Sequence, residues 1–228
     1  IIKKQKQGYL KMQKSFLIFL IFTSLLLAQT HQGFPPEIGC FTIEIEGKEI
    51  GIAKYVLQLT EDGWVNFGWE MRLDNETVNK THYKTDLTPE MKLINYYSIT
   101  GEDSFNIKYA DNWAEFSLNN EEKVKSVSCP EQPFVLDIMN IGHWAIISKM
   151  VKINIAHPQY FTVLPNQGNT TIDLMATPTI LEKVDGEMRK KIEFEADKIL
   201  TYIWVDTTNS RAYRIEMPEK KFVATYNP

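Results

Sequence analysis

The sequence predicts a mainly β protein in which a strongly curved antiparallel sheet, a half-barrel built as a meander, surrounds one central helix. Three observations lead to this fold class. Apolar and polar residues alternate through most of the chain, which is the period of a strand with one covered face. The alternating segments are short and separated by a few turn residues, which favours antiparallel neighbours. One long apolar run, residues 133–151, is the segment long enough for a helix of four or five turns.

The start of the chain indicates export. Residues 1–11 precede Met12 and are expected to be an upstream extension without a structural role. Residues 12–28 have a lysine-bearing start and an apolar stretch, the layout of a secretory signal peptide, with cleavage expected near Ala28. The apolar stretch is shorter than the roughly 20 residues that span a bilayer. We therefore expect a periplasmic or extracellular protein with no stable membrane span after cleavage.

The charge of the remaining chain argues against two classes of partner. Residues 1–28 contain five of the 25 basic residues and no acidic one, which leaves 20 basic against 29 acidic residues and a net charge of −9. An acidic surface repels phosphate backbones and anionic lipid headgroups, so nucleic-acid binding is not expected. Residues 29–228 lack a Gly/Ser-rich or Pro-rich linker and are predicted to form a single domain.

The first half of this domain alternates almost without pause. The clearest strand is 64–73, in which Val65, Phe67, Trp69 and Met71 share one apolar face. This face is predicted to lie against the helix. Strands are expected at about 41–45, 49–59, 64–73, 78–85, 93–100, 104–109, 113–118 and 122–127.

The second half, after the long apolar run, again alternates apolar and polar residues. Asp185-Gly186 is a two-residue hairpin signal between two of the strands. The helix is expected at about 133–150, with Pro133 in its first turn, where a missing N–H costs no intrahelical bond. Further strands are expected at about 151–155, 160–164, 170–176, 179–184, 187–196, 199–206, 211–217 and 221–225.

Two cysteines, Cys40 and Cys129, leave two alternatives open. In an oxidising compartment they are candidates for a disulfide, which would close a long loop and stabilise the fold by about 3 to 4 kcal/mol. They are equally interpretable as two thiols that act as small hydrophobes. No CxxC or Cys/His grouping indicates metal binding or redox chemistry, and no cofactor is expected.

The sequence carries no catalytic signature, and we do not expect an enzyme. GxSxG and HExxH motifs are absent from the sequence. His143 lies in the helical run with Asp137 about 240° away around a helix, so the two are not expected to act as a catalytic pair. His143 is interpreted as a histidine that is hydrogen-bonded in the core, and the histidines lack the spacing of metal ligands.

Three segments carry a resemblance to a known family. VLDIMNIGHWAII, VLPNQG and the closing IWVDTTNSRAYRIEMP hairpin, together with the β meander, resemble a family of exported bacterial proteins of unknown function. The resemblance covers most of residues 38–225, and its architecture is similar to the half-barrel of periplasmic lipoprotein carriers. It implies the fold and the compartment. Ile138 stands where that family has an asparagine, with Asn140 displaced, so no polar role is carried over.

These observations favour two non-enzymatic functions. The first is a carrier of a lipid or other hydrophobic small molecule, held between the sheet and the helix. Its candidate ligand-binding residues are Val65, Phe67, Trp69, Met71, Tyr97, Tyr109 and Trp144. The second is an envelope assembly or protein-interaction module with a filled core, whose sheet edge or outer surface binds a partner not identified by the sequence. An apolar cavity would support the first function, and a filled interior would support the second.

Overall fold

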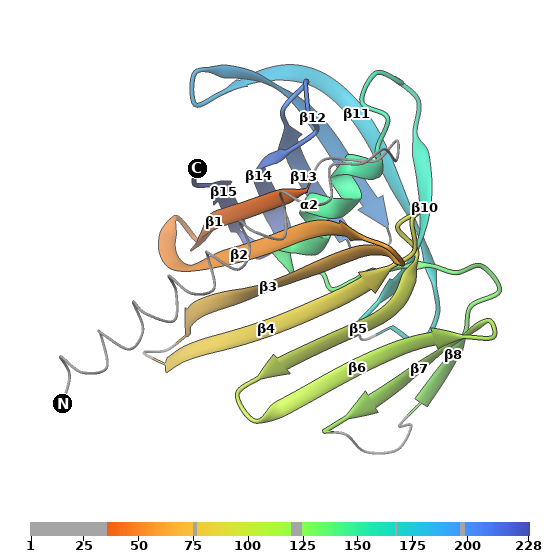
Figure 1. The fold of residues 1–228 in the computed structure, drawn as a ribbon. Helices are drawn as coiled ribbons and strands as arrows, with labels where there is room; N and C mark the ends of the chain where they lie inside the picture. The colour runs from red at the N-terminus through yellow and green to blue at the C-terminus, as the bar shows by residue number, and fades with distance from the viewer. Residues whose placement is uncertain (1–35, 75–76, 120–124, 167, 197–198) are drawn as a thin grey trace.

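The computed structural model describes residues 36–74, 77–119, 125–166, 168–196 and 199–228. The expected upstream extension and signal peptide, residues 1–28, lie outside these described residues. Fifteen strands in the described part of the chain form one sheet, and the sheet is not closed. It curves around one α-helix, α2, as predicted (Figure 1).

The sheet has two wings that meet at its centre. The chain enters at the middle strand β1 and builds one wing outward from it. This wing contains β1 (Glu37–Ile45), β2 (Lys48–Thr60), β3 (Gly63–Asp74), β4 (Thr77–Leu87), β5 (Leu93–Thr100), β6 (Asp103–Ala110), β7 (Trp113–Leu118) and β8 (Lys125–Ser128). Each strand pairs antiparallel with the next, which confirms the predicted meander.

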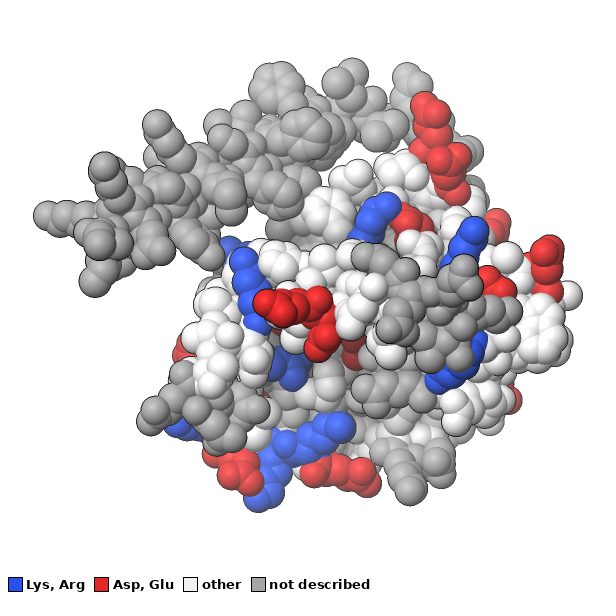
Figure 2. Space-filling model, turned by 90° about the horizontal axis from the view of Figure 1, so that it is seen from below, with Lys and Arg blue, Asp and Glu red and all other residues white. Residues whose placement is uncertain are grey.

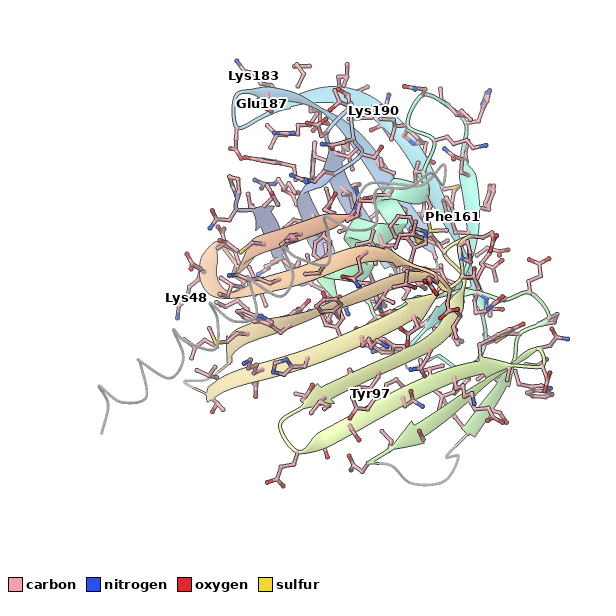
Figure 3. All side chains as sticks on the ribbon, in the orientation of Figure 1. Lys48, Tyr97, Phe161, Lys183, Glu187 and Lys190 are labelled. Carbon is pink, nitrogen blue, oxygen red and sulfur yellow. The ribbon has the colours of Figure 1, made fainter. Side chains whose placement is uncertain are left out.

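The second wing runs from the far edge back to the centre. It contains β9 (Phe134–Leu136), β10 (Gln159–Pro165), β11 (Ile172–Val184), β12 (Glu187–Ala196), β13 (Ile199–Val205), β14 (Ala212–Met217) and β15 (Phe222–Tyr226), with a short 3₁₀ helix η1 (Pro218–Lys220) before the last strand. β15 pairs antiparallel with β1, so the first and last strands lie side by side (Figure 1). The predicted two-residue turn at Asp185-Gly186 joins β11 to β12, and both residues have the positive φ that such a turn requires. Lys183 and Glu187 mark the tip of this long hairpin (Figure 3).

The helix α2 (Ile141–Met150) is shorter than predicted. The expected helix from 133 to 150 is wrong in its first half, because Phe134–Leu136 form β9, a fully buried strand that pairs parallel with β10. A short run of apolar residues is compatible with either a buried strand or a buried helix, because its hydrophobic pattern is the same in both. The chain turns after β9, and Asn140 caps the helix by accepting a hydrogen bond from the His143 N–H at 3.3 Å.

Two further predictions about strands fail. Residues 151–155 form no strand, since Val151 is the C-terminal cap of α2 and turns follow it. Residues 170–176 and 179–184 belong to one strand, β11, with an irregularity in pairing between Pro178 and Leu181. Proline lacks the N–H that a regular ladder uses, which accounts for the interruption within a continuous strand.

Nearly all of α2 is buried inside the curve of the sheet. Its residues from Ile141 to Lys149 are all buried. Trp144 is fully buried, donates its indole N–H to the Ile138 carbonyl at 2.8 Å and meets the Phe194 ring edge-on. These contacts fill the space between α2 and the second wing, so the indole occupies core volume.

Charged groups hold the end of α2 inside the core. The buried Lys149 ammonium lies 2.6 Å from the buried Glu37 carboxylate of β1. Glu37 also accepts a hydrogen bond from the Tyr55 hydroxyl and lies 3.4 Å from the Arg211 guanidinium. A buried charge without a partner costs several kcal/mol, so this network fixes the helix end against β1 and β2.

Replacing Trp144 by alanine tests the packing of the helix. We expect Trp144→Ala to lower the free energy of unfolding by about 3 to 5 kcal/mol, because a fully buried indole leaves a cavity that the sheet cannot close. The matched control is Trp113→Ala, since Trp113 is 46% exposed on β7. Chemical denaturation of both variants measures the difference, and equal losses would contradict the packing role.

Candidate functional site

On the inner face of the first wing, side chains of neighbouring strands form rows across the sheet. Residues directly opposite each other in paired strands share a face of the sheet. One inner row contains Gly68 of β3, Tyr83 of β4, Ser98 of β5, Phe105 of β6 and Leu118 of β7. The next inner row, towards one end of the strands, contains Glu70, Thr81 and Thr100. These two rows meet the start of α2.

A cleft of about 440 Å³ lies over these rows, beside the N-terminus of α2. It is bounded by β3 to β7, by the loop between β9 and α2, and by the segment after β10. Its lining residues are Glu70, Arg72, Asn79, Thr81, Tyr83, Ser98, Thr100, Phe105, Leu118, Asp137, Met139, Asn140 and Asn166. Most of these residues carry a polar group, while apolar atoms form the larger part of the exposed lining, so the cleft is of mixed character and differs from the apolar cavity that the sequence led us to expect.

Glu70 ties the sheet to the start of the helix. Its Oε1 accepts a hydrogen bond from the Ile141 N–H at 2.8 Å, and its Oε2 accepts one from Arg72 at 2.6 Å. Arg72 also donates to the Met139 carbonyl at 2.7 Å. The first N–H groups of a helix have no intrahelical partner, and a carboxylate there also faces the positive end of the helix dipole. Burial nevertheless raises the pKa of Glu70, and the Arg72 charge only partly offsets that rise.

Asp137 is fixed in the loop before the helix. Its Oδ2 accepts a hydrogen bond from the Tyr96 hydroxyl at 2.7 Å, and its Oδ1 accepts one from the Met139 N–H at 3.1 Å. Burial raises the pKa of this carboxyl as well, against the lowering effect of those hydrogen bonds. Both carboxyl groups of the cleft therefore have every oxygen engaged by the protein.

His143 lies in the core and is hydrogen-bonded to Asp137, a residue of the cleft lining. Its Nδ1 accepts the Asp137 backbone N–H at 3.0 Å, so the proton of the neutral ring resides on Nε2, which lies 2.8 Å from Oγ1 of the buried Thr85. The imidazole is fully buried, and burial lowers its pKa to about 3. The prediction that His143 is hydrogen-bonded in the core is confirmed.

Several buried polar atoms at or beside the cleft make no hydrogen bond of ordinary geometry with the described residues. They are both side-chain polar atoms of Asn66, the hydroxyl of Tyr83 and the amide nitrogen of Asn140. Tyr83 is 4% exposed and Asn140 is 3% exposed, and both line the cleft. Two glycines make room for the phenol, because a Cβ would lie 2.7 Å from its oxygen at Gly68 and 2.4 Å at Gly142. Buried polar groups are almost always paired, so these atoms indicate a place for water or a ligand.

The residues predicted to bind a ligand do not line this cleft. Because Asn66 and Glu70 point inward, the alternate residues of β3 point to the outer face of the sheet. The predicted placement of the apolar β3 face beneath the helix is therefore wrong. The residues affected are Val65, Phe67, Trp69 and Met71, the last of which is 36% exposed. Trp69 lies under the ammonium groups of Lys54 and Lys80, at 5.8 and 5.6 Å from the ring centroid.

The other three predicted residues also lie elsewhere. Tyr97, on β5, pairs with Lys84 on the same outer face and is labelled on its strand in Figure 3. Tyr109 points inward outside the cleft and donates to the Cys129 carbonyl at 3.2 Å. Trp144 lies in the core.

Cys40 and Cys129 are both free thiols in the structure. Cys40 lies on β1 at the centre of the sheet, whereas Cys129 follows β8 at its edge. Six strands lie between β1 and β8, and neighbouring strands are about 4.8 Å apart, so the geometry is that of two separate thiols. Burial raises the pKa of the Cys129 thiol.

Other site types find no support among the described residues. No group of three or more His, Cys, Asp or Glu side chains there is arranged to hold a metal ion. Within the same ranges, no helix has the length and apolar character needed to cross a membrane. Figure 2 shows basic and acidic side chains interspersed on the face seen there, without a large patch of one sign.

One sequence feature indicates the cleft, but the prediction from alternating apolar residues did not use it. After Trp64, the second face of the strand 63–74 consists of Asn66, Gly68, Glu70 and Arg72, with no large apolar side chain. A glycine inside a strand marks the close approach of another group, here the Tyr83 phenol. Asn140, directly before the helical residues, is also a helix-start signal.

The fold and the cleft define a β-barrel-like protein with an internal helix and a helix-capped concave surface of mixed character. No protein-family model and no curated protein matches the sequence. The structure is similar to the crystal structure of a β-barrel-like protein of the domain of unknown function DUF1849 from Brucella abortus. The TM-score is 0.54 with 10% identity, and the alignment covers 84% of this chain and 94% of that chain. This likeness confirms the predicted fold class.

Exchanging His143 for glutamine tests the buried imidazole. A folded-state pKa of about 3 against 6.5 means that stability present above pH 6.5 is lost as pH falls towards 3, by roughly 4 to 5 kcal/mol. Glutamine offers an acceptor and a donor without titrating, so we expect His143→Gln to lack this part of the acid dependence. The raised pKa values of Glu70 and Asp137 make the folded state more stable as the pH falls, which is opposite to the effect of His143. This contribution is the same in the wild type and in His143→Gln.

The measurement is urea denaturation across this pH range for the wild type, His143→Gln and the control His82→Gln. His82 is only slightly buried, and the control should therefore follow the wild type. An unchanged acid dependence in His143→Gln would contradict the assignment of a neutral, buried imidazole.

Proposed function

We propose that this chain is an exported, non-enzymatic binding protein that holds a small ligand in the concave cleft beside α2. The observation that carries this proposal is the pair of buried polar groups of Tyr83 and Asn140, which line the cleft and make no hydrogen bond of ordinary geometry with the described residues. A cleft of about 440 Å³ is within the range of small-molecule sites and exceeds the space that one or two bridging waters need. A ligand with polar groups would satisfy these atoms.

The lining changes the expected chemistry of the ligand. Phe105, Leu118 and Met139 are the wholly apolar residues of the lining. The interior around α2 is filled by fully buried side chains such as Trp144 and Phe194. Desolvating polar groups against an acyl chain would cost free energy without replacing their hydrogen bonds. If a lipid binds in the cleft, its polar headgroup rather than its chain is the part that this lining accommodates.

The arrangement of charged groups supports binding rather than catalysis. Both ring nitrogens of His143 are engaged, by Asp137 N–H and by Thr85. The oxygens of Glu70 and Asp137 accept hydrogen bonds from the backbone or from neighbouring side chains. These hydrogen bonds hold the loop and the helix start, which is a structural use of the groups that would otherwise be candidates for general acid or base.

A second candidate function is the interaction module. It is favoured by apolar side chains on the outer face at one end of β3 and β4, where Leu73 is 44% exposed and Val78 is 60% exposed. These two residues are cross-strand partners. Such a surface fits a protein contact better than a small ligand, and it is separate from the cleft.

Filling the cleft separates the two functions. Ser98 lies on the inner face of β5 and lines the cleft, whereas Ser104 of β6 is the cross-strand partner of Ile99 on the outer face. We expect native mass spectrometry of protein purified from its own cells to show a bound small molecule. Ser98→Phe should reduce its occupancy about tenfold or more, and Ser104→Phe, the same change on the other face, should leave it unchanged. A protein that carries no bound small molecule would favour the interaction module.

Export is tested by the N-terminus of the protein. Removal of the segment 12–28 by signal peptidase should leave a chain that begins near residue 29, because the apolar stretch ends at Ala28. N-terminal sequencing of protein from the periplasmic or extracellular fraction makes the measurement. A retained Met12, or protein found in the cytoplasmic fraction alone, would refute export.

A further inference from the structure

We infer that the ligand of the concave cleft is a neutral, polyhydroxylated molecule of the sugar class. This inference rests on the proposed binding function and adds the chemical class of the ligand. It follows from the charge of the lining, from the polar groups that make no hydrogen bond of ordinary geometry, and from the apolar side chains that continue their row.

The charged groups of the cleft are already paired with other protein groups, which disfavours a charged ligand. Arg72 lies 2.6 Å from Glu70, and its guanidinium also donates to the Met139 carbonyl. An anion would therefore meet a cation that is already paired, with the Asp137 carboxyl nearby. A cation would have to share carboxyl oxygens that hold the helix start and the loop. Removing a charge from water is costly unless it gains a full partner, so a neutral ligand is favoured.

The groups without a hydrogen bond of ordinary geometry are neutral, and together they offer both donors and an acceptor. The Tyr83 hydroxyl can donate and accept, and the Asn140 amide nitrogen carries donors. Along the same inner face lie the hydroxyls of Thr81 and Thr100, which bond each other at 2.8 Å, and that of Ser98. A hydroxyl of a ligand also both donates and accepts, so it satisfies such groups in either orientation. Acyl, carboxylate and ammonium groups each lack one or both of these capacities.

These side chains lie on neighbouring strands of one face of the sheet. Directly opposite side chains in an antiparallel pair lie about 4.5 to 5.5 Å apart at Cβ. Tyr83 and Ser98 form one such pair, and Thr81 and Thr100 form another on the same face. A compact polyol that lies across these strands can contact side chains of more than one pair.

Apolar side chains beside the polar groups provide a surface for the C–H groups of a sugar. Phe105 continues the Ser98 row on β6, and Leu118 follows it on β7. The Phe105 ring is ordered by edge-on contact with Tyr96 and tilted contact with Phe116, at centroid distances of 6.3 and 6.0 Å. A pyranose presents C–H groups on one face and hydroxyls at its rim. The cleft offers the apolar surface and the polar groups in a corresponding arrangement.

The test is isothermal titration calorimetry of the purified protein with a matched series of probes. The neutral probes are glucose, galactose and N-acetylglucosamine. The charged analogues are glucuronate and glucosamine, the latter at a pH where its amine is protonated, and decanoate represents an acyl chain. We expect at least one neutral sugar to bind, and to bind at least tenfold more tightly than its charged analogues and decanoate. Tighter binding of glucuronate, glucosamine or decanoate, or no binding of any neutral sugar, would overturn the inference.

A single-atom variant places the binding in the cleft. Tyr83→Phe removes a hydroxyl that makes no hydrogen bond of ordinary geometry with the described residues, so the fold should be retained, as thermal denaturation can check. It should weaken sugar binding about tenfold to a hundredfold, because the ligand hydroxyl loses its partner. Tyr97→Phe makes the same change on the outer face and should have no effect. Equal sugar affinity in Tyr83→Phe and the wild type would also overturn the inference.

The failure of this inference is distinguishable from the failure of the proposed function. If a co-purifying molecule is present and is displaced by Ser98→Phe but proves to be charged or acylated, the binding function stands and the sugar class is wrong. If no small molecule co-purifies and no probe binds, both are wrong.

Discussion

A helix enclosed by a sheet must have its backbone ends satisfied without water, and this requirement shapes the centre of the molecule. The first N–H groups of α2 receive Glu70 and the Asn140 side chain, and the last turn places Lys149 against Glu37. These partners come from β3, from the preceding loop and from β1. The sheet therefore cannot present a uniformly apolar inner face, because some of its inward positions must carry charge.

The cleft is a consequence of that requirement. Inward polar residues on β3 and β4 are needed at the start of the helix, and they extend beyond the atoms that contact it. Gly68 and Gly142 leave space in which the Tyr83 hydroxyl is buried without a hydrogen bond of ordinary geometry to the described residues. Elsewhere the inner face is filled by apolar side chains such as Phe41 and Ile43. Polarity is concentrated where the helix begins, so the site and the support of the helix use the same elements.

The sequence correctly predicted those parts of the fold in which the apolar residues of an alternating strand are also the buried ones. Phe41 and Ile43 are fully buried on β1 as their alternation indicated, and the meander follows from the short turns. On β3 the agreement fails, because a period of two shows that the faces differ but does not show which one is covered. The face of Asn66 and Glu70 lies inside, where Glu70 accepts the Ile141 N–H at the helix start, and the apolar face of Phe67 lies outside. The partner of Glu70, the Ile141 N–H, is 71 residues away, and no local pattern reports such a contact.

The pairing of β1 with β15 determines when the fold becomes complete. Phe41 is opposite Tyr226, so the central seam of the sheet joins residues that are 185 positions apart in the chain. Contacts between distant residues form late, because the entropy of closing the loop must first be lost. Until the last strand has left the ribosome, β1 presents an unpaired edge at the middle of the unfinished sheet. The seam thus keeps a growing chain from completing the sheet until β15 is available, and a chain truncated before β15 would lack the central join.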